Sequence, residues 1–234
     1  MPSGERLDTA RVFERVFAIY RAQAGVLLPA GLIIYLIPAS LVMANSIWPQ
    51  LAASFICTVF YQGLAAQAVR DIQDETRDLS LTGLFRSVGP AFAQLLWTAL
   101  LVLIGVALGS LAFLIPGLVL GTMWAVAVPA VVYEVRTAPQ ALSRSAQLVR
   151  GQGWRVFGIL LVTVLILFVA DGALAAAATG ISGSKVVLAV GNLISSALTA
   201  PMLALASAVL YLELVKLKGE PPPPADMASF NRER

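Results

Sequence analysis

The chain has 234 residues, of which 59% are hydrophobic and 12% are charged, and its formal net charge is +3. This composition excludes an ordinary soluble globular domain. Histidine is absent and the one cysteine is Cys57, which also excludes His-based catalysis, His-based metal sites and a disulfide framework. The basic residues flank apolar segments and are interleaved with acids, so the expected partner is the lipid bilayer with its anionic phospholipid headgroups, not nucleic acid. No cofactor is expected.

Six apolar segments are long enough to cross a bilayer. A helix rises about 1.5 Å per residue, so roughly 20 residues span about 30 Å of hydrocarbon. We predict an all-α integral membrane bundle of six transmembrane helices in three hairpins, each preceded by a short amphipathic interfacial helix. The amphipathic segment 1–24 precedes the transmembrane domain, 25–212, and a disordered Pro-rich tail, 213–234, follows it. The predicted spans are 25–47, 51–69, 91–115, 118–133, 156–178 and 186–212.

The segment 1–24 carries apolar side chains such as Val12 and Val16 on one helical face, with Arg15 away from it. We expect this face to lie in the headgroup boundary and Arg15 to contact lipid phosphates. The first apolar run is too long for a signal peptide and lacks a small-residue cleavage site. It is therefore expected to act as an uncleaved signal anchor.

A second amphipathic helix is predicted before the third span, with Ser80 as its N-cap and Arg86 directed to the headgroups. The densest acidic cluster of the chain precedes it. On a helix that continues the second span, these acids share a face, as an oxygen-ligand site for Mg²⁺ or Ca²⁺ needs. A solvated loop with internal ion pairs is the alternative. The acids are Asp71, Asp74, Glu75 and Asp78.

The third and fourth spans form one long apolar run that is interrupted only by Pro116 and Gly117. This pair suits a tight turn between two antiparallel helices, so we predict two spans and not one. Two GxxxG spacings flank the turn and permit close approach of helix backbones. Their glycines are Gly105 and Gly109 in the third span, and Gly117 and Gly121 in the fourth.

A third amphipathic helix is predicted after the fourth span. Thr137 is a suitable N-cap, with Gln140 three residues later in the pattern of a capping box. We expect Arg144, Trp154 and Arg155, which lie in and after this helix, to contact lipid headgroups.

Asp171 is the one carboxylate inside a predicted span, and an acid in a membrane indicates a functional site by default. It forms either a structural pair with Lys185 across the external turn, a hydrated interfacial acid, or part of a proton or ion relay. Asn192 lies in a polar part of the sixth span, 192–199, which either packs against neighbouring helices or lines a polar path.

The basic residues give the orientation. If the six segments cross the membrane, fifteen of the sixteen Lys and Arg residues fall on one side, and only Lys185 on the other. The positive-inside rule then places both termini in the cytoplasm.

The third unit, Ala-Leu-Ser-Arg-Ser at 141–145 followed by Leu148, Gly151, Trp154 and Arg155, resembles the membrane domain family of glycerophosphoryl diester phosphodiesterases. The opening Val-Phe-Ala-Ile-Tyr-Arg at 16–21 is similar to the start of that family. The resemblance covers nearly the whole chain and implies an all-helical bacterial inner-membrane protein. It does not imply catalysis, because members that hydrolyse glycerophosphodiesters do so in a separate barrel domain, which this sequence does not contain.

Three functions follow from these patterns. The favoured one is a non-catalytic, multi-pass inner-membrane protein that organises or senses lipids or anchors a partner at the cytoplasmic face. The second is a small transporter or channel that uses Asp171 and the polar sixth span. The third is a lipid-headgroup enzyme that uses the acidic cluster with a bound cation. The glycine-rich faces permit packing within one chain or a homo-oligomer, and a membrane-protein partner is also open.

Overall fold

The computed structural model describes residues 7–42, 47–73, 88–134, 137–182 and 184–220, and every regular element in these ranges is a helix. Within them, six segments are long and apolar enough to cross a membrane: Thr9–Leu41, Ile47–Arg70, Gly89–Leu111, Leu114–Glu134, Gly153–Ser182 and Lys185–Leu217. They overlap the six segments predicted from the sequence. The prediction of an all-helical chain with six helices of membrane-spanning length is therefore confirmed.

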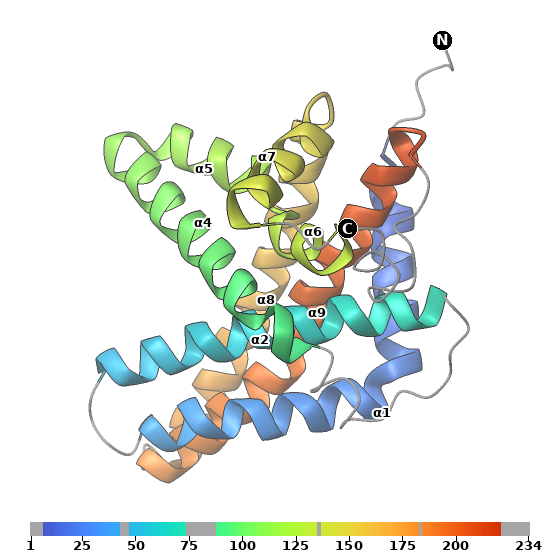
Figure 1. Cartoon of the computed structure of the whole chain (residues 1–234). Helices are drawn as coiled ribbons and strands as arrows, with labels where there is room; N and C mark the ends of the chain where they lie inside the picture. Colours follow the sequence, from blue (N-terminus) through green and yellow to red (C-terminus); the bar gives the residue numbers. More distant parts are fainter. Residues whose placement is uncertain (1–6, 43–46, 74–87, 135–136, 183, 221–234) are drawn as a thin grey trace.

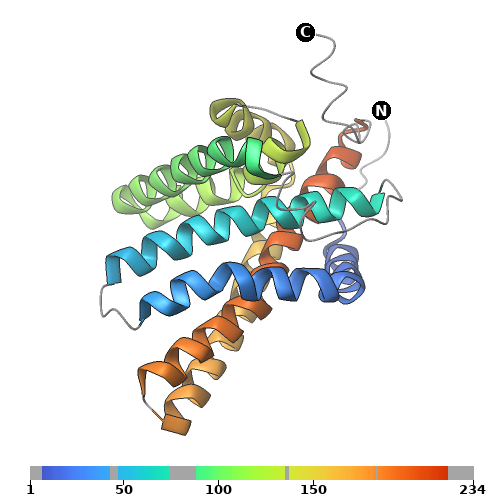
Figure 2. The same ribbon diagram turned by 60° about the horizontal axis from the view of Figure 1, so that its bottom comes forward.

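The first helix, α1 (Thr9–Leu41), is continuous but sharply bent. Its N-cap is Asp8, whose Oδ1 accepts a hydrogen bond from the Ala10 N–H at 3.1 Å. Figures 1 and 2 show the first part of α1 running across the direction of its remainder. Pro29 lies inside the helix and has no N–H for the carbonyl of Gly25, which loosens the helix there. The predicted boundary at residue 24 thus falls within one helix.

Helix α2 (Ile47–Gln73) is followed, beyond 74–87, by a 3₁₀ turn, η2 (Gly89–Ala91), and by α4 (Phe92–Ala112) and α5 (Leu114–Met123). The turn between α4 and α5 is at Phe113, whose backbone is extended, and not at Pro116 as predicted. Pro116 is the third residue of α5, where a helix does not use its N–H groups. The split of the long apolar run into two helices is confirmed.

The glycines of α4 and α5 permit the close approach that their spacing suggested. A Cβ built on Gly109 would lie 3.2 Å from the Cα of Gly117, and one built on Gly117 would lie 1.9 Å from the Oγ of Ser110. Neither position has room for a side chain. The two backbones therefore touch at these residues.

The fourth apolar segment is not one straight helix. It breaks at residues 124–126 between α5 and α6 (Ala127–Glu134). The next helix, α7 (Ala138–Val149), places Ser145 at this break, where its Oγ donates to the Met123 carbonyl at 2.8 Å and accepts from the Val126 N–H at 3.3 Å. The serine hydroxyl therefore replaces helix hydrogen bonds that the break removes.

Helices α8 (Gly153–Ser182) and α9 (Lys185–Leu217) complete the fold. Helix α9 packs against α1, α2 and α8, and every residue from 204 to 212 is buried, which makes α9 the centre of the bundle. It continues to Leu217, so residues 213–217, predicted to belong to the disordered tail, are helical. Residues 221–234 of that tail lie outside the described ranges.

The helix ends separate into two sides. The last turns of α1, α4 and α8 and the first turns of α2, α5 and α9 lie toward the left of Figure 1, and the first turn of α1 and the last turn of α9 lie away from them. Figure 2 shows the same separation of these helix ends from the first turn of α1 and the last turn of α9. The outer surfaces of α4 and α8 carry many exposed apolar side chains, as helices that face lipid do.

Candidate functional site

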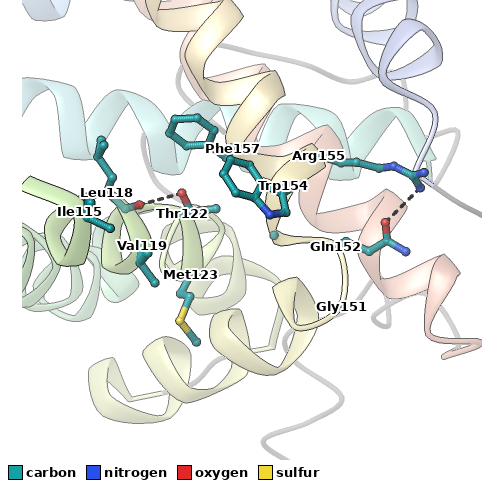
Figure 3. A pocket seen from close by; sticks show the side chains of 11 residues that line it. Ile115, Leu118, Val119, Thr122, Met123, Gly151, Gln152, Trp154, Arg155 and Phe157 are labelled. Carbon is teal, nitrogen blue, oxygen red and sulfur yellow. Dashed lines mark hydrogen bonds between the residues drawn. The ribbon is translucent and has the colours of Figure 1, made fainter.

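A groove of about 860 Å³ lies between α5 and the start of α8, near the corner that joins α7 to α8. Figure 3 shows Ile115, Leu118 and Val119 of α5 on one side, and Trp154 and Phe157 of α8 on the other. The Thr122 hydroxyl, also in the groove, donates to the Leu118 carbonyl of its own helix at 2.7 Å. The walls are therefore almost wholly apolar.

The corner between α7 and α8 sets the position of Trp154. Residues 149–152 form a type II turn, in which the Gln152 N–H donates to the Val149 carbonyl at 2.9 Å and Gly151 has φ of +92°. Only glycine adopts this φ without strain, and no atom lies within 4 Å of a Cβ built there. The glycine is therefore required by the turn and not by close packing.

Trp154 and Arg155, both predicted to contact headgroups, lie at this corner. The Trp154 side chain is 87% exposed, and its ring meets that of Phe157 edge to face at 6.0 Å between centroids. Arg155 turns its guanidinium away from Phe157, and its Nη1 donates to the Gln152 Oε1 at 3.3 Å (Figure 3). Lys218 brings another positive charge here, because its Nζ donates to the Arg150 carbonyl at 3.1 Å.

A second, polar hollow surrounds Asp171. Two adjoining cavities of about 370 and 230 Å³ lie among α1, α2, α8 and α9 and share Asp171, Asn192 and Ser196. We treat them as one feature and call it the polar cleft. The remaining polar side chains that line it are Tyr35, Gln50, Ser54, Thr58, Tyr61, Gln62, Ser195 and Thr199.

Within the polar cleft, Asp171 is bonded to α9 and not to Lys185. Its Oδ1 accepts a hydrogen bond from the Ser195 hydroxyl. Among the described residues no ion pair joins it to Lys185, which lies exposed at the first position of α9. Asp171 lies well before the end of α8, because the eleven residues from Asp171 to Ser182 extend about 16 Å along the helix, and Lys185 follows that end. The suggested Asp171–Lys185 pair is thus not formed.

Two arginines that were predicted to contact lipid headgroups form ion pairs with glutamates. Arg15 of α1 pairs with Glu213 of α9. Arg144 of α7 donates from Nε to Glu134 at 2.7 Å and from Nη1 to Glu220 at 3.1 Å, and its side chain is only 14% exposed. The bonds to Glu220 raise the pKa of Arg144, and the same bonds lower the pKa of Glu220.

Arg144 belongs to a wider cluster at this end of the bundle. The Tyr211 hydroxyl of α9 donates to Glu134, and the Tyr211 ring stacks on Tyr133 of α6 with 5.0 Å between centroids. The cluster ties α6, α7 and the end of α9 together. Sequence reasoning missed the bond between Glu134 and Tyr211 because 77 residues separate them in the chain.

The other candidates are not tested by the structure. Arg86 and the acids Asp74, Glu75 and Asp78 lie outside the described residues, and of Asp71 only the backbone is described. The second amphipathic helix falls in the same gap. The third is α7, whose cap is formed as expected, since the Thr137 N–H donates to the Gln140 Oε1 at 3.2 Å.

The apolar face of α7, which we expected to enter the headgroup boundary, is instead buried. Ala141, Ser145, Leu148 and Val149 are all covered, and α7 packs against α4 and α6. This face therefore contributes to the protein core.

Comparisons of the chain with protein families, with curated proteins and with solved structures find no match. The family resemblance described above stays a prediction from the sequence.

Proposed function

We propose that this chain is a non-catalytic, multi-pass protein of the bacterial inner membrane that holds and organises anionic phospholipid at the cytoplasmic face. In this proposal both termini are cytoplasmic, and the six long helices form three hairpins. The observation that carries it is the groove between α5 and α8, which has apolar walls and a basic, tryptophan-bearing corner at one end.

The apolar walls of the groove suit the acyl chains of a phospholipid, and its basic corner suits the anionic headgroup. Its apolar walls come from helices of membrane-spanning length, so in a bilayer lipid acyl chains contact these walls. Its corner carries Trp154, a residue type that favours the membrane interface, together with Arg155 and Lys218. Its volume, about 860 Å³, lies in the upper part of the range of about 300–1,000 Å³ for ligand pockets.

The charge distribution supports the orientation. The corner beside the groove lies in a segment that also contains Arg144, Arg150 and Arg155, and basic segments stay on the cytoplasmic side. The first part of α1 runs across the rest of that helix (Figure 1), as an interfacial helix before a span does. In this part Val12 and Val16, whose face we expected in the headgroup boundary, are instead buried in the protein core. Phe17 is exposed and is available to the headgroup boundary.

The test fills the groove with a side chain. Val119 is half-exposed and lines the groove, whereas Val164 is equally exposed on the α8 surface and does not. We expect Val119→Trp to lose at least half of the phosphatidylglycerol that copurifies with the wild-type chain after detergent washing. The matched control, Val164→Trp, keeps it. Equal phosphatidylglycerol in the three proteins, measured by lipid mass spectrometry, contradicts the proposal.

A further inference from the structure

The polar cleft around Asp171 is separate from the groove between α5 and α8, and one of its walls is a single face of α9. Asn192, Ser195, Ser196 and Thr199 follow the spacing i, i+3, i+4, i+7, which places them on one side of a helix. The Thr199 hydroxyl donates to the Ser195 carbonyl of its own helix at 2.9 Å. The other three side chains line the cavity that contains Asp171.

The opposite wall comes from α1 and α2. Tyr35 of α1 and Thr58 of α2 are joined through their hydroxyls at 3.2 Å, and Gln62 lies one turn beyond Thr58. Hydrogen-bonding groups thus surround the cleft from four helices. This density of polar groups is unusual for segments of membrane-spanning composition.

The cleft is blind. It extends along α9 from Leu188 to Leu203, about 22 Å by the helical rise. Beyond Leu203 the helix is buried from 204 to 212, and at this end Tyr61 is buried, with its hydroxyl donating to the Leu27 carbonyl at 2.9 Å. Among the described residues the cleft is therefore closed at this end, as a binding site is.

Among the described residues, no basic side chain pairs with Asp171, the acid of the cleft. Asp171 accepts a hydrogen bond from the Ser195 hydroxyl, and no described basic residue forms an ion pair with it. A carboxylate at membrane depth is costly unless a positive charge lies beside it. A ligand that brings this charge removes the cost, so the site favours a cation.

The size of the cleft selects among cations. Cavities of about 370 and 230 Å³ far exceed a bare metal ion, and a single carboxylate is a poor ligand set for a divalent one. An organic ammonium group can form an ion pair with Asp171, and its N–H groups can donate hydrogen bonds to Ser196 and to the amide oxygen of Asn192. We propose that the polar cleft binds the ammonium group of a small organic cation or of a phospholipid headgroup, with Asp171 as its counter-ion.

The test measures binding of radiolabelled ethanolamine and putrescine to the full chain in nanodiscs of phosphatidylglycerol alone, which contain no ammonium lipid. We expect saturable binding of at least one probe. Asp171→Asn should weaken it by about tenfold or more, which corresponds to about 1.4 kcal/mol. The matched control is Asp8→Asn, which removes the same charge far from the cleft and keeps a good helix cap.

A second variant keeps the test independent of folding defects at Asp171. Asn192→Ala retains the carboxylate and should also weaken binding, with a melting temperature close to that of the wild type. Adding phosphatidylethanolamine to the nanodiscs separates the two sources of the ammonium group, because a lipid occupant lowers the apparent affinity for the soluble probe. Binding of ²²Na⁺ but of neither ammonium probe overturns the proposal, as does unchanged probe binding in folded Asp171→Asn.

Discussion

The break in the fourth apolar segment depends on one hydroxyl group. Ser145 and Val126 are fully buried, and in the described structure Ser145 supplies the partner of the Val126 N–H and a donor to the Met123 carbonyl. Ser145→Ala removes both bonds without a large change of volume. A buried polar group left without a partner costs about 1–3 kcal/mol, and alanine returns about 0.5 kcal/mol of helix propensity. Two groups, the Val126 N–H and the Met123 carbonyl, lose their partner, so we expect the free energy of unfolding to fall by about 1.5–5.5 kcal/mol.

The assay is reversible unfolding in mixed micelles titrated with SDS, followed by tryptophan fluorescence, since Trp124 lies in the break itself. Ser143→Ala is the control, because Ser143 is exposed on the same helix and, among the described residues, accepts a bond only from Gln147, at 3.3 Å. We expect this control to change stability by less than about 0.5 kcal/mol. If Ser145→Ala is no more destabilising than Ser143→Ala, the hydroxyl does not hold the break.

Three further predictions concern stability, each measured by thermal melting of the purified protein. Gly117→Ala should lower the free energy of unfolding by about 1–3 kcal/mol, because the added Cβ collides with α4. Gly158→Ala, which has open space around it, should be neutral or stabilising. Equal effects of the two substitutions contradict the contact between α4 and α5. Gly151→Ala should lower the free energy of unfolding by about 1–3 kcal/mol, because alanine is strained at a φ of +92°. An unchanged stability contradicts the type II turn. Arg144 lowers the pKa of Glu220 below its ordinary 4.5, so the contribution of Glu220 is complete above that pH and is lost as pH falls through the lowered pKa. Glu220→Gln should thus flatten the acid side of the melting curve against pH, and an unchanged acid side contradicts this pairing.

Hydropathy predicted the number and the approximate position of the long helices, because length and apolar content are local properties of the chain. It did not predict that the fourth segment breaks at residues 124–126, since the sequence there stays apolar and the compensating hydroxyl comes from Ser145, 19 residues later. Pro116 was assigned to the turn because proline is common in turns, yet the first turn of a helix also accepts it.

The candidate site was predicted only in part. Trp154 and Asp171 were selected because an interfacial tryptophan and a membrane-embedded acid are recognisable residue by residue. Their surroundings depend on tertiary packing: Asp171 meets Ser195 from the next helix, and Arg15 meets Glu213, 198 residues away. Counting charges along the chain cannot distinguish an arginine that faces lipid from one that a distant glutamate holds.

The most direct test of lipid binding in the groove is photo-crosslinking with phosphatidylglycerol that carries a diazirine on its acyl chain, followed by mass spectrometry of the peptides. The internal control is the outer face of α4, where Leu103 and Leu108 are at least as exposed as the groove residues Leu118 and Val119. We predict adducts concentrated on α5 and on residues 154–157, well above the level on α4. Adducts spread evenly over α4, α5 and α8 would show that the groove holds no lipid in preference to the rest of the surface.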